Sequence, residues 1–181
     1  MTELGKEKEL AKQIIAEIIR QAGGTLDNKT NLYKAFYHAH LHYAENQPGY
    51  LSAWPIVRMP RGPGIHNFDL LLGELMAEGK VETKQVDWAG RTGFRFTLCA
   101  PAAQPNRLPE GAIQAIAHGV QQVVGKSAEQ VSREAHEMSR AWRNSQDGEE
   151  LNIYTDTIPE DEYRRRLERM KELADAFSDW C

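Results

Sequence analysis

The chain has 181 residues, of which 41% are hydrophobic, and its formal net charge at pH 7 is -4. This length is enough for one independent hydrophobic core, so we expect a single main domain. No apolar run reaches the roughly 20 residues that a membrane span needs, and the first residues are rich in lysine and glutamate, unlike a signal peptide. We therefore expect a cytoplasmic protein.

The acidic balance and the cysteine content exclude several classes of site. A surface devoted to nucleic acid generally needs basic residues that displace counterions from phosphates, and this chain is net negative. Cys99 and Cys181 are too few for a disulfide framework and lack the spacing of a zinc site. We predict that both are ordinary free thiols and that the protein carries no cofactor.

Two amphipathic helices are predicted near the start of the chain. Apolar residues recur at helical spacing over 7–22, and Gly23 and Gly24 then supply the residue type that ends a helix. After a turn over 25–30, aromatic and apolar residues again follow a spacing of three and four. This pattern predicts a second helix over 31–44 with one buried stripe.

The middle of the chain combines a rigid segment with a helix and a hairpin. Prolines and glycines exclude regular helix over 54–65 and predict a short strand followed by a constrained loop. A leucine-rich stripe predicts a third helix over 66–78. Two segments, 81–86 and 92–98, flank a turn over 87–91 and predict a β-hairpin.

The second half is predicted to be mainly helical. A capping box formed by Ser127 and Gln130 marks the start of one helix. The predicted segments are a linker over 101–109, a helix over 113–124, a helix over 128–142, a polar loop over 144–150, an extended segment over 151–154 and a final helix after Pro159. The whole pattern predicts a mainly α-helical α+β fold, with about six helices and a small antiparallel hairpin or sheet. We expect one domain over 1–155, with the C-terminal helix over 156–181 packed on it or used for partner binding.

No catalytic or metal-binding motif stands out. His38 and His42 are four residues apart and could face one metal ion, but the glutamate of an HExxH motif is missing and His40 lies on the apolar stripe. We interpret these histidines as core or surface residues. The chain also lacks a nucleophile elbow and a phosphate-binding loop, so we predict that it is not an enzyme.

The order helix, helix, short strand, helix and hairpin over 7–98 is that of a winged-helix module. In such a module the third helix would read the DNA groove. That helix carries Asp69, Glu74 and Glu78 without a lysine or arginine, which opposes contact with phosphates. A winged-helix transcriptional regulator remains the alternative, and the same architecture also serves as a platform for proteins.

The proline-rich loop is the strongest candidate for a partner surface. Arginine and aromatic residues are enriched at binding hot spots, and a rigid loop has little ordering entropy left to lose. The predicted partner contacts are Trp54, Arg58, Arg61 and His66, and the residues predicted to fix the loop are Pro60, Gly62 and Pro63. A purely structural role for this loop is the competing interpretation.

Several ordered motifs resemble the SocA-like Panacea antitoxin family. The front half contains NLYKAFYHAHLHYA (31–44), WPIVRMPRGP (54–63) and NFDLLLGELMAEGKV (67–81). The back half follows the family's order with Lys126-Ser127-Ala128, Glu134-Ala135-His136, Ala141-Trp142, Gly148 and Ile153-Tyr154. Two features depart from the family pattern. Arg61 stands where an aromatic residue commonly precedes Gly-Pro, and the helix after Pro159 has no counterpart in the shared motifs.

The resemblance implies a protein that acts by contact with another protein. Members of this family neutralise a companion toxin by direct binding, and one member delivers its toxin to a cytoplasmic protease. Phage-associated relatives without an established toxin are also known, so an interaction module of that kind is a further alternative. The resemblance assigns His136 and Trp142 to the family motif.

Overall fold

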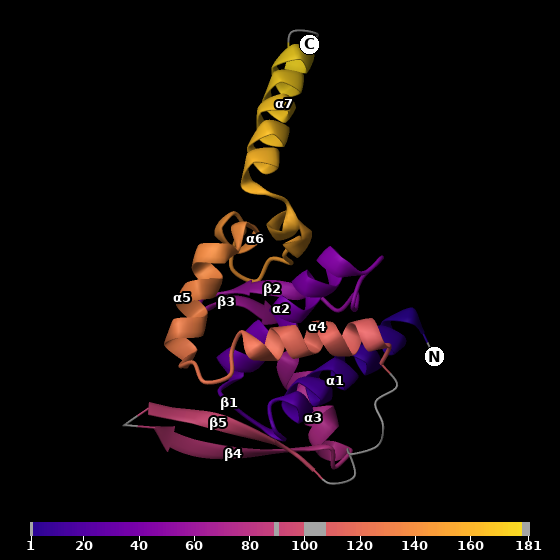
Figure 1. Cartoon of the computed structure of the whole chain (residues 1–181), viewed down its shortest axis with the longest axis vertical. Helices are drawn as coiled ribbons and strands as arrows, with labels where there is room; N and C mark the ends of the chain where they lie inside the picture. Colours follow the sequence, from indigo (N-terminus) through magenta and orange to yellow (C-terminus); the bar gives the residue numbers. More distant parts are fainter. Residues whose placement is uncertain (1, 89–90, 100–107, 179–181) are drawn as a thin grey trace.

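The computed structural model describes residues 2–88, 91–99 and 108–178 (Figure 1). Nearly all of the predicted linker over 101–109, the hairpin tip at 89–90 and Cys181 lie outside the described residues. The helices are α1 (Glu3–Gln21), α2 (Lys29–Asn46), α3 (Phe68–Ala77), α4 (Glu110–Gln121), α5 (Ala128–Met138), α6 (Arg140–Arg143), α7 (Glu160–Ser178) and the 3-10 helix η2 (Ile153–Thr157). The strands are β1 (Thr25–Asp27), β2 (Ile56–Met59), β3 (Gly62–Ile65), β4 (Val81–Trp88) and β5 (Arg91–Leu98). The predicted mainly helical α+β class is confirmed.

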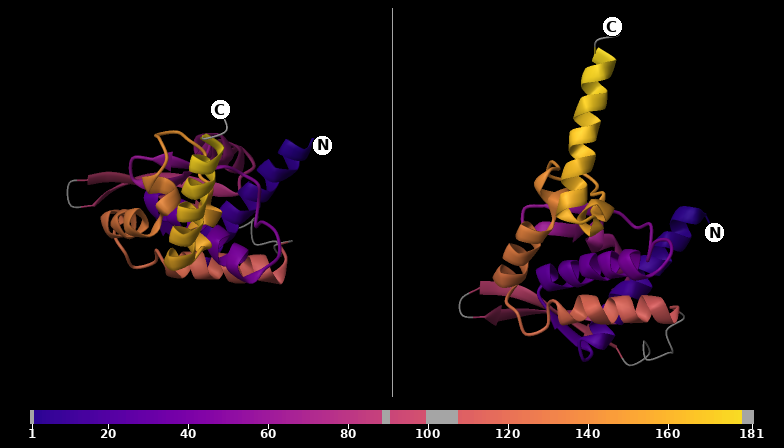
Figure 2. Two further views of the ribbon diagram at one scale, coloured as in Figure 1. Left: turned by 90° about the horizontal axis from the view of Figure 1, so that it is seen from above. Right: turned by 45° about the horizontal axis from the view of Figure 1, so that its top comes forward.

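Helix α2 is the centre of the molecule. All residues from Asn31 to Leu41 are buried, so this helix is covered around its whole circumference. It packs against α1, α4, α5, β3 and η2, and α4 runs alongside it (Figure 2). A helix buried on all sides does not need the one-sided apolar stripe that the sequence predicted. Polar residues on its other faces are buried as well.

The larger sheet has the antiparallel strand order β1-β5-β4. Its inner face contributes Leu26, Val81 and Phe96 to the core, and Leu26 pairs with Phe96 in the register. The sequence predicted the β4–β5 hairpin but gave β1 as a turn. This three-residue strand exists because β5, far along the chain, pairs with it, so local sequence carries little signal for it. The predicted front-half order is present, with β1 and β3 as additional strands.

Two predicted segments in the back half differ from the structure. The helix predicted over 128–142 is interrupted at Ser139, whose extended backbone separates α5 from α6. The Ser139 hydroxyl accepts a hydrogen bond from the backbone of Trp142 and donates one to Asp156, so the break is held from both sides. The extended segment predicted over 151–154 is extended only where Leu151 N–H bonds to Ile56, and η2 follows.

Helix α7 leaves the body and projects away from it (Figures 1 and 2). The predicted domain boundary at 155 falls too early, because Asp156 is bound inside the body by Tyr37 and Ser139. Near its base, the Arg140 guanidinium lies 4.6 Å from the Tyr163 ring. Further along, α7 is exposed over the described residues, so it does not pack on the body.

Gly119 sets the distance between α2 and α4 and provides a test of this packing. A Cβ at Gly119 would lie 2.3 Å from the Ala35 carbonyl oxygen, whereas a Cβ at Gly73 on α3 would meet nothing within 4 Å. We expect Gly119→Ala to lower the free energy of unfolding by about 3 kcal/mol, because two backbones must separate. Gly73→Ala should raise the free energy of unfolding by up to about 1 kcal/mol through helix propensity. Urea denaturation measures both changes, and equal effects would contradict the close α2–α4 contact.

Candidate functional site

The proline-rich segment forms the hairpin of β2 and β3. Met59 pairs with Gly62, which leaves Pro60 and Arg61 as the turn. Proline is favoured at the first central position of such a turn, and Gly62 has a φ of +98°, where an L side chain is strained. The loop predicted after the first strand therefore consists of a turn at Pro60 and Arg61, followed by strand β3. On the α5 side, the Ser132 hydroxyl donates to the Arg61 carbonyl at 3.0 Å.

Lys34 of α2 lies directly beneath this turn. Its side chain is only 1% exposed, and its Nζ donates to the Pro63 carbonyl at 2.6 Å. A Cβ at Gly62 would come within 2.9 Å of this Nζ and 3.2 Å of the His136 ring, so glycine allows all three groups to meet. Burial lowers the pKa of Lys34 to about 7. No carboxylate within the described residues forms an ion pair with it.

The two family-motif residues form a stacked pair beside the hairpin. The rings of His136 and Trp142 are nearly parallel, with centroids 3.9 Å apart. Trp142 also donates from its indole nitrogen to the Met59 carbonyl at 2.8 Å, and the Arg58 guanidinium lies 4.6 Å from its ring. Burial, followed by the nearby charges of Lys34 and Arg58, lowers the pKa of His136 and favours its neutral form. This pair attaches the hairpin to α5 and α6.

The structure separates the four predicted partner contacts into two groups. Trp54 is a core residue whose indole nitrogen donates to the His66 carbonyl at 2.9 Å, so its prediction as a partner contact is wrong. Arg58 is held by Trp142 and by an ion pair with Asp147, so its main contacts are internal. Arg61 and His66 are exposed. For these two residues the role in partner binding stays a prediction.

Two cavities lie on either side of Arg61. The larger, of about 1080 Å³, is bordered by Asn31, the start of α5 and His136. Among the described residues, Asn31 Oδ1 and His136 Nε2 are buried without a hydrogen-bond partner. The smaller cavity, of about 690 Å³, lies between the hairpin turn, the first half of α2 and the start of α3, and Lys34 lines it.

The histidines of α2 have separate surroundings. His40 lies 2.8 Å from the Phe36 carbonyl through Nδ1 and 2.9 Å from the Ser52 hydroxyl through Nε2. His38 is buried, and burial lowers the pKa values of both His38 and His40 to about 4. His42 instead stacks on His118 of α4, with ring centroids 4.2 Å apart. These positions give the histidines packing roles within the helical core.

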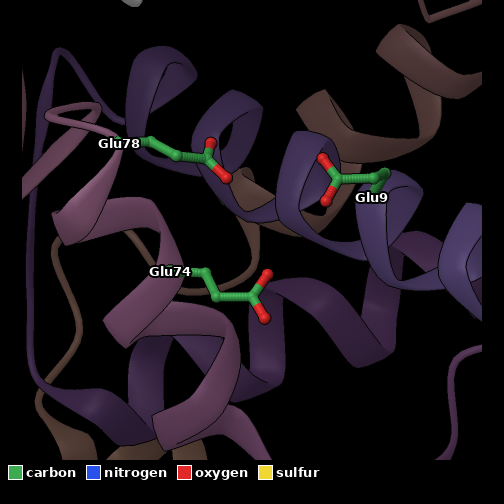
Figure 3. Close-up of side chains that lie close together, drawn as sticks. All are labelled: Glu9, Glu74 and Glu78. Carbon is green, nitrogen blue, oxygen red and sulfur yellow. The ribbon is translucent and has the colours of Figure 1, made fainter.

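Three carboxylates, from α1, α3 and the C-cap of α3, form the one acidic cluster of metal-binding size within the described residues (Figure 3). The oxygens of Glu9, Glu74 and Glu78 lie within 4.8 Å of one another. The ammonium of Lys12 occupies the space between them, at 2.8 Å from Glu9 and 3.1 Å from Glu74, and also bonds to Glu78. Burial alone would lower the pKa of Lys12, but these three hydrogen bonds raise it above its ordinary value. Lys12 therefore serves as the cation of this cluster.

Sequence reasoning missed Lys12 and Lys34. Both occupy positions at helical spacing from buried residues: Lys12 precedes Ile15 and Ile19, and Lys34 precedes Tyr37 and Leu41. A lysine on the buried face of an otherwise apolar helix was the available signal. It could indicate that a buried cation exists, but not which groups surround it.

Comparison with known proteins adds no relative. No protein-family model, no curated protein and no solved structure matches the chain. The resemblance to the Panacea family therefore stays a prediction. Across the described ranges, no helix combines the length and the apolar content needed to cross a membrane.

The Lys12 cluster predicts a pH-dependent loss of stability in Lys12→Met. Hydrogen bonds from Lys8 and Lys12 lower the pKa of Glu74; burial alone would raise the pKa of Glu78, but its bonds to Lys12 and Lys80 lower it. Carboxylates with lowered pKa values stabilise the fold above their ordinary pKa of about 4.3 and lose this effect as the pH falls through the lowered values. Lys12→Met should lower the melting temperature by several degrees at neutral pH and by much less in acid.

Lys29→Met is the matched control for this measurement, because its ion pair with Asp69 is largely exposed. We expect its melting temperature to stay near that of the wild type at every pH. If the melting temperature of Lys12→Met is lower than that of the wild type by the same amount from neutral to acidic pH, lost packing and not the ion-pair cluster causes the effect.

Proposed function

We propose that this protein is an antitoxin-like binding protein that neutralises a companion toxin in the cytoplasm by direct contact, without catalysis, and that α7 is its main docking element. The motif resemblance supports the antitoxin class. The observation that carries the proposal is the apolar stripe of α7, which is exposed from Leu167 onward within the described residues. An exposed apolar stripe of this kind marks a surface that binds a partner, because binding removes the apolar side chains from water.

The stripe has the spacing of a helix that binds in a groove. Tyr163, Leu167, Met170, Ala174 and Phe177 are separated by four, three, four and three residues and therefore share one face. Met170 is 65% exposed and Phe177 is 73% exposed. Peptide helices that enter apolar grooves use anchors at this spacing. The stripe thus matches one recognised mode of helix binding.

The base of α7 is fixed to the body, which lowers the ordering cost of binding. Arg140 forms an ion pair with Glu160 at 3.2 Å, and its guanidinium covers the Tyr163 ring. It also donates to the carbonyl of Ile158 in the turn that leads into α7. Because the helix already has a defined direction, a partner would have little chain to order on binding.

The charges beside the stripe disfavour a second copy of this chain as the occupant. In a parallel pair of α7 helices with Tyr163 and Met170 at core positions, Arg166 of one helix would face Lys171 of the other. Like charges at these flanking positions oppose pairing. We therefore assign the stripe to an apolar groove on a different protein, the toxin.

The winged-helix alternative has support from the order of the elements alone. The residues of α3 that face solvent include Asp69, Leu70 and Met76, and the helix contains no lysine or arginine. Asp69 is already paired with Lys29 at 2.6 Å. A helix that presents acidic and apolar side chains is poorly suited to a phosphate backbone. Protein binding is the better supported proposal.

A charge in the α7 stripe should disrupt toxin binding without unfolding the body. In Met170→Glu and Phe177→Glu the carboxylate would enter an apolar interface, so we expect at least about tenfold weaker binding, or 1.4 kcal/mol. The control is Arg169→Glu, which places negative charge on an exposed face of α7 away from the stripe and keeps the three ion pairs of its first turns. The measurement is growth rescue and co-purification when each variant is expressed with the product of the adjacent reading frame, together with its melting temperature.

Full rescue by Met170→Glu and Phe177→Glu at unchanged stability would reject α7 as the docking element. If no adjacent product inhibits growth or co-purifies, the antitoxin proposal itself is rejected. Light scattering adds one further outcome. A dimer that Met170→Glu converts to a monomer would assign the stripe to a second copy of the chain.

Arg61 allows the predicted hairpin contact to be tested in the same assay. Its side chain is exposed at the tip of the turn, so truncation should leave the melting temperature unchanged. If Arg61 is an anchor, Arg61→Ala should weaken toxin binding by about 2 kcal/mol. Rescue and affinity equal to wild type in Arg61→Ala would limit the interface to α7.

A further inference from the structure

The cavity between the hairpin turn and α3 contains an uncompensated buried cation. Lys34 lines this cavity, is 1% exposed and donates one hydrogen bond, to the Pro63 carbonyl. The remaining N–H groups of its ammonium have no carboxylate partner among the described residues. An ammonium buried without a counter-ion is unfavourable by several kcal/mol, so such groups usually lie beside an anion or lose their proton.

A second feature of the same cavity also favours an anion. Helix α3 begins in its wall at Asn67, which has a left-handed backbone and makes no side-chain capping bond. The first N–H groups of a helix have no partner within the helix and carry partial positive charge. Lys29 and Arg61 lie at the rim, and the one carboxylate there, Asp69, is paired with Lys29 at 2.6 Å. The cavity therefore has an excess of positive charge.

The walls determine what the rest of the ligand must be. Apolar side chains line the cavity. They are the buried Tyr33 of α2, the partly buried Met59 of β2, and Phe68 and Leu70 of α3. The volume of about 690 Å³ is within the usual range for small-molecule sites. A ligand would place a charged head near Lys34 and an apolar body against these side chains.

We propose that this cavity binds a small organic anion, a carboxylate or phosphate ester with an apolar body, whose head group pairs with Lys34. The site is separate from α7, so it does not depend on the proposed toxin contact. Its anion would also lie beside the turn that carries Arg61. Occupancy therefore places a counter-ion beside the hairpin that the described residues do not supply.

The proton bound by Lys34 gives the proposal a specific signature. Burial lowers the pKa of Lys34 to about 7, and a bound anion would raise it, so binding should take up a proton above neutral pH. Near Lys34 lie His38 on the same helix, His136 on α5 and Arg61 on the hairpin, and the same cavity is also lined by Lys29, Tyr33 and Asp69. Both histidines have lowered pKa values, so neither of them titrates above neutral pH.

The experiment is calorimetry with two anionic probes and one neutral analogue on the full chain. Benzoate represents a carboxylate with an apolar body, and benzamide has the shape of benzoate without its charge. Sulfate stands in for a phosphate group because it has the same tetrahedral shape and its charge does not change with pH in this range. We expect benzoate, sulfate or both to bind, and benzamide not to bind. Affinity should fall about tenfold per pH unit above the pKa of free Lys34, with nearly one proton taken up per anion. The stronger of the two probes identifies the head group.

Variants separate this site from general attraction by a basic surface. Lys34→Met should weaken binding at least about tenfold and remove the pH dependence, because the titrating cation is gone. Lys126→Met removes a partly exposed lysine paired with Glu134 outside this cavity and should leave affinity within about twofold. If Lys34→Met does not fold, two other measurements test the proposal. These are the anion affinity of Arg61→Ala, which should be lower because a positive charge at the rim is lost, and the proton uptake by the wild type. Equal binding by Lys34→Met, equal binding of benzamide and benzoate, absence of proton uptake, or no binding of either anion at about 10 mM would overturn the proposal.

Discussion

The complete burial of α2 is the constraint on which the rest of the structure depends. A helix covered on all sides must find a partner inside the protein for each of its polar side chains, because an unpaired buried polar group is unfavourable by about 1–3 kcal/mol. Four of these side chains each bind a different segment. Lys34 holds the Pro63 carbonyl of the hairpin, Asn31 holds Lys126 before α5, Tyr37 holds Asp156 of η2, and His40 contacts Ser52. The polar groups of one helix thus position the loops around it.

Lys34 differs from the other members of this set because its protonated form carries a positive charge. Asn31, Tyr37 and His40 are neutral side chains, and a hydrogen bond to a carbonyl or carboxylate oxygen is enough to pair their polar groups in whole or in part. The Pro63 carbonyl, in contrast, cannot neutralise the charge of an ammonium. Lys12 shows what a compensated buried lysine looks like in the same fold, since three carboxylates surround it and raise its pKa. Both lysines are buried, but only Lys12 is surrounded by carboxylates. For this reason we assign a ligand to the cavity beside Lys34 and none to the cluster around Lys12.

The sequence predicts the helices well where periodicity and caps agree, and it fails where partners are distant in the chain. The capping box of Ser127 and Gln130 is present as predicted, because it is a local interaction. Strand β1 and the break at Ser139 depend on β5 and on Asp156, which no local pattern reveals. The loop over 54–65 was identified as rigid, but the burial of Trp54 is set by packing and hydrogen bonding around His66.

The body and α7 are stabilised by different interactions, which allows the stripe of α7 to remain exposed. A 19-residue helix without tertiary packing is marginally stable in water. Its first turns carry three ion pairs at a spacing of four, Glu160–Arg164, Asp161–Arg165 and Glu162–Arg166, each with the acidic residue first, the more favourable orientation. Acidic residues in the first turn also interact favourably with the helix dipole. Because these charges support the helix, Met170 and Phe177 are not needed to stabilise it. Their apolar surface is therefore available to a partner.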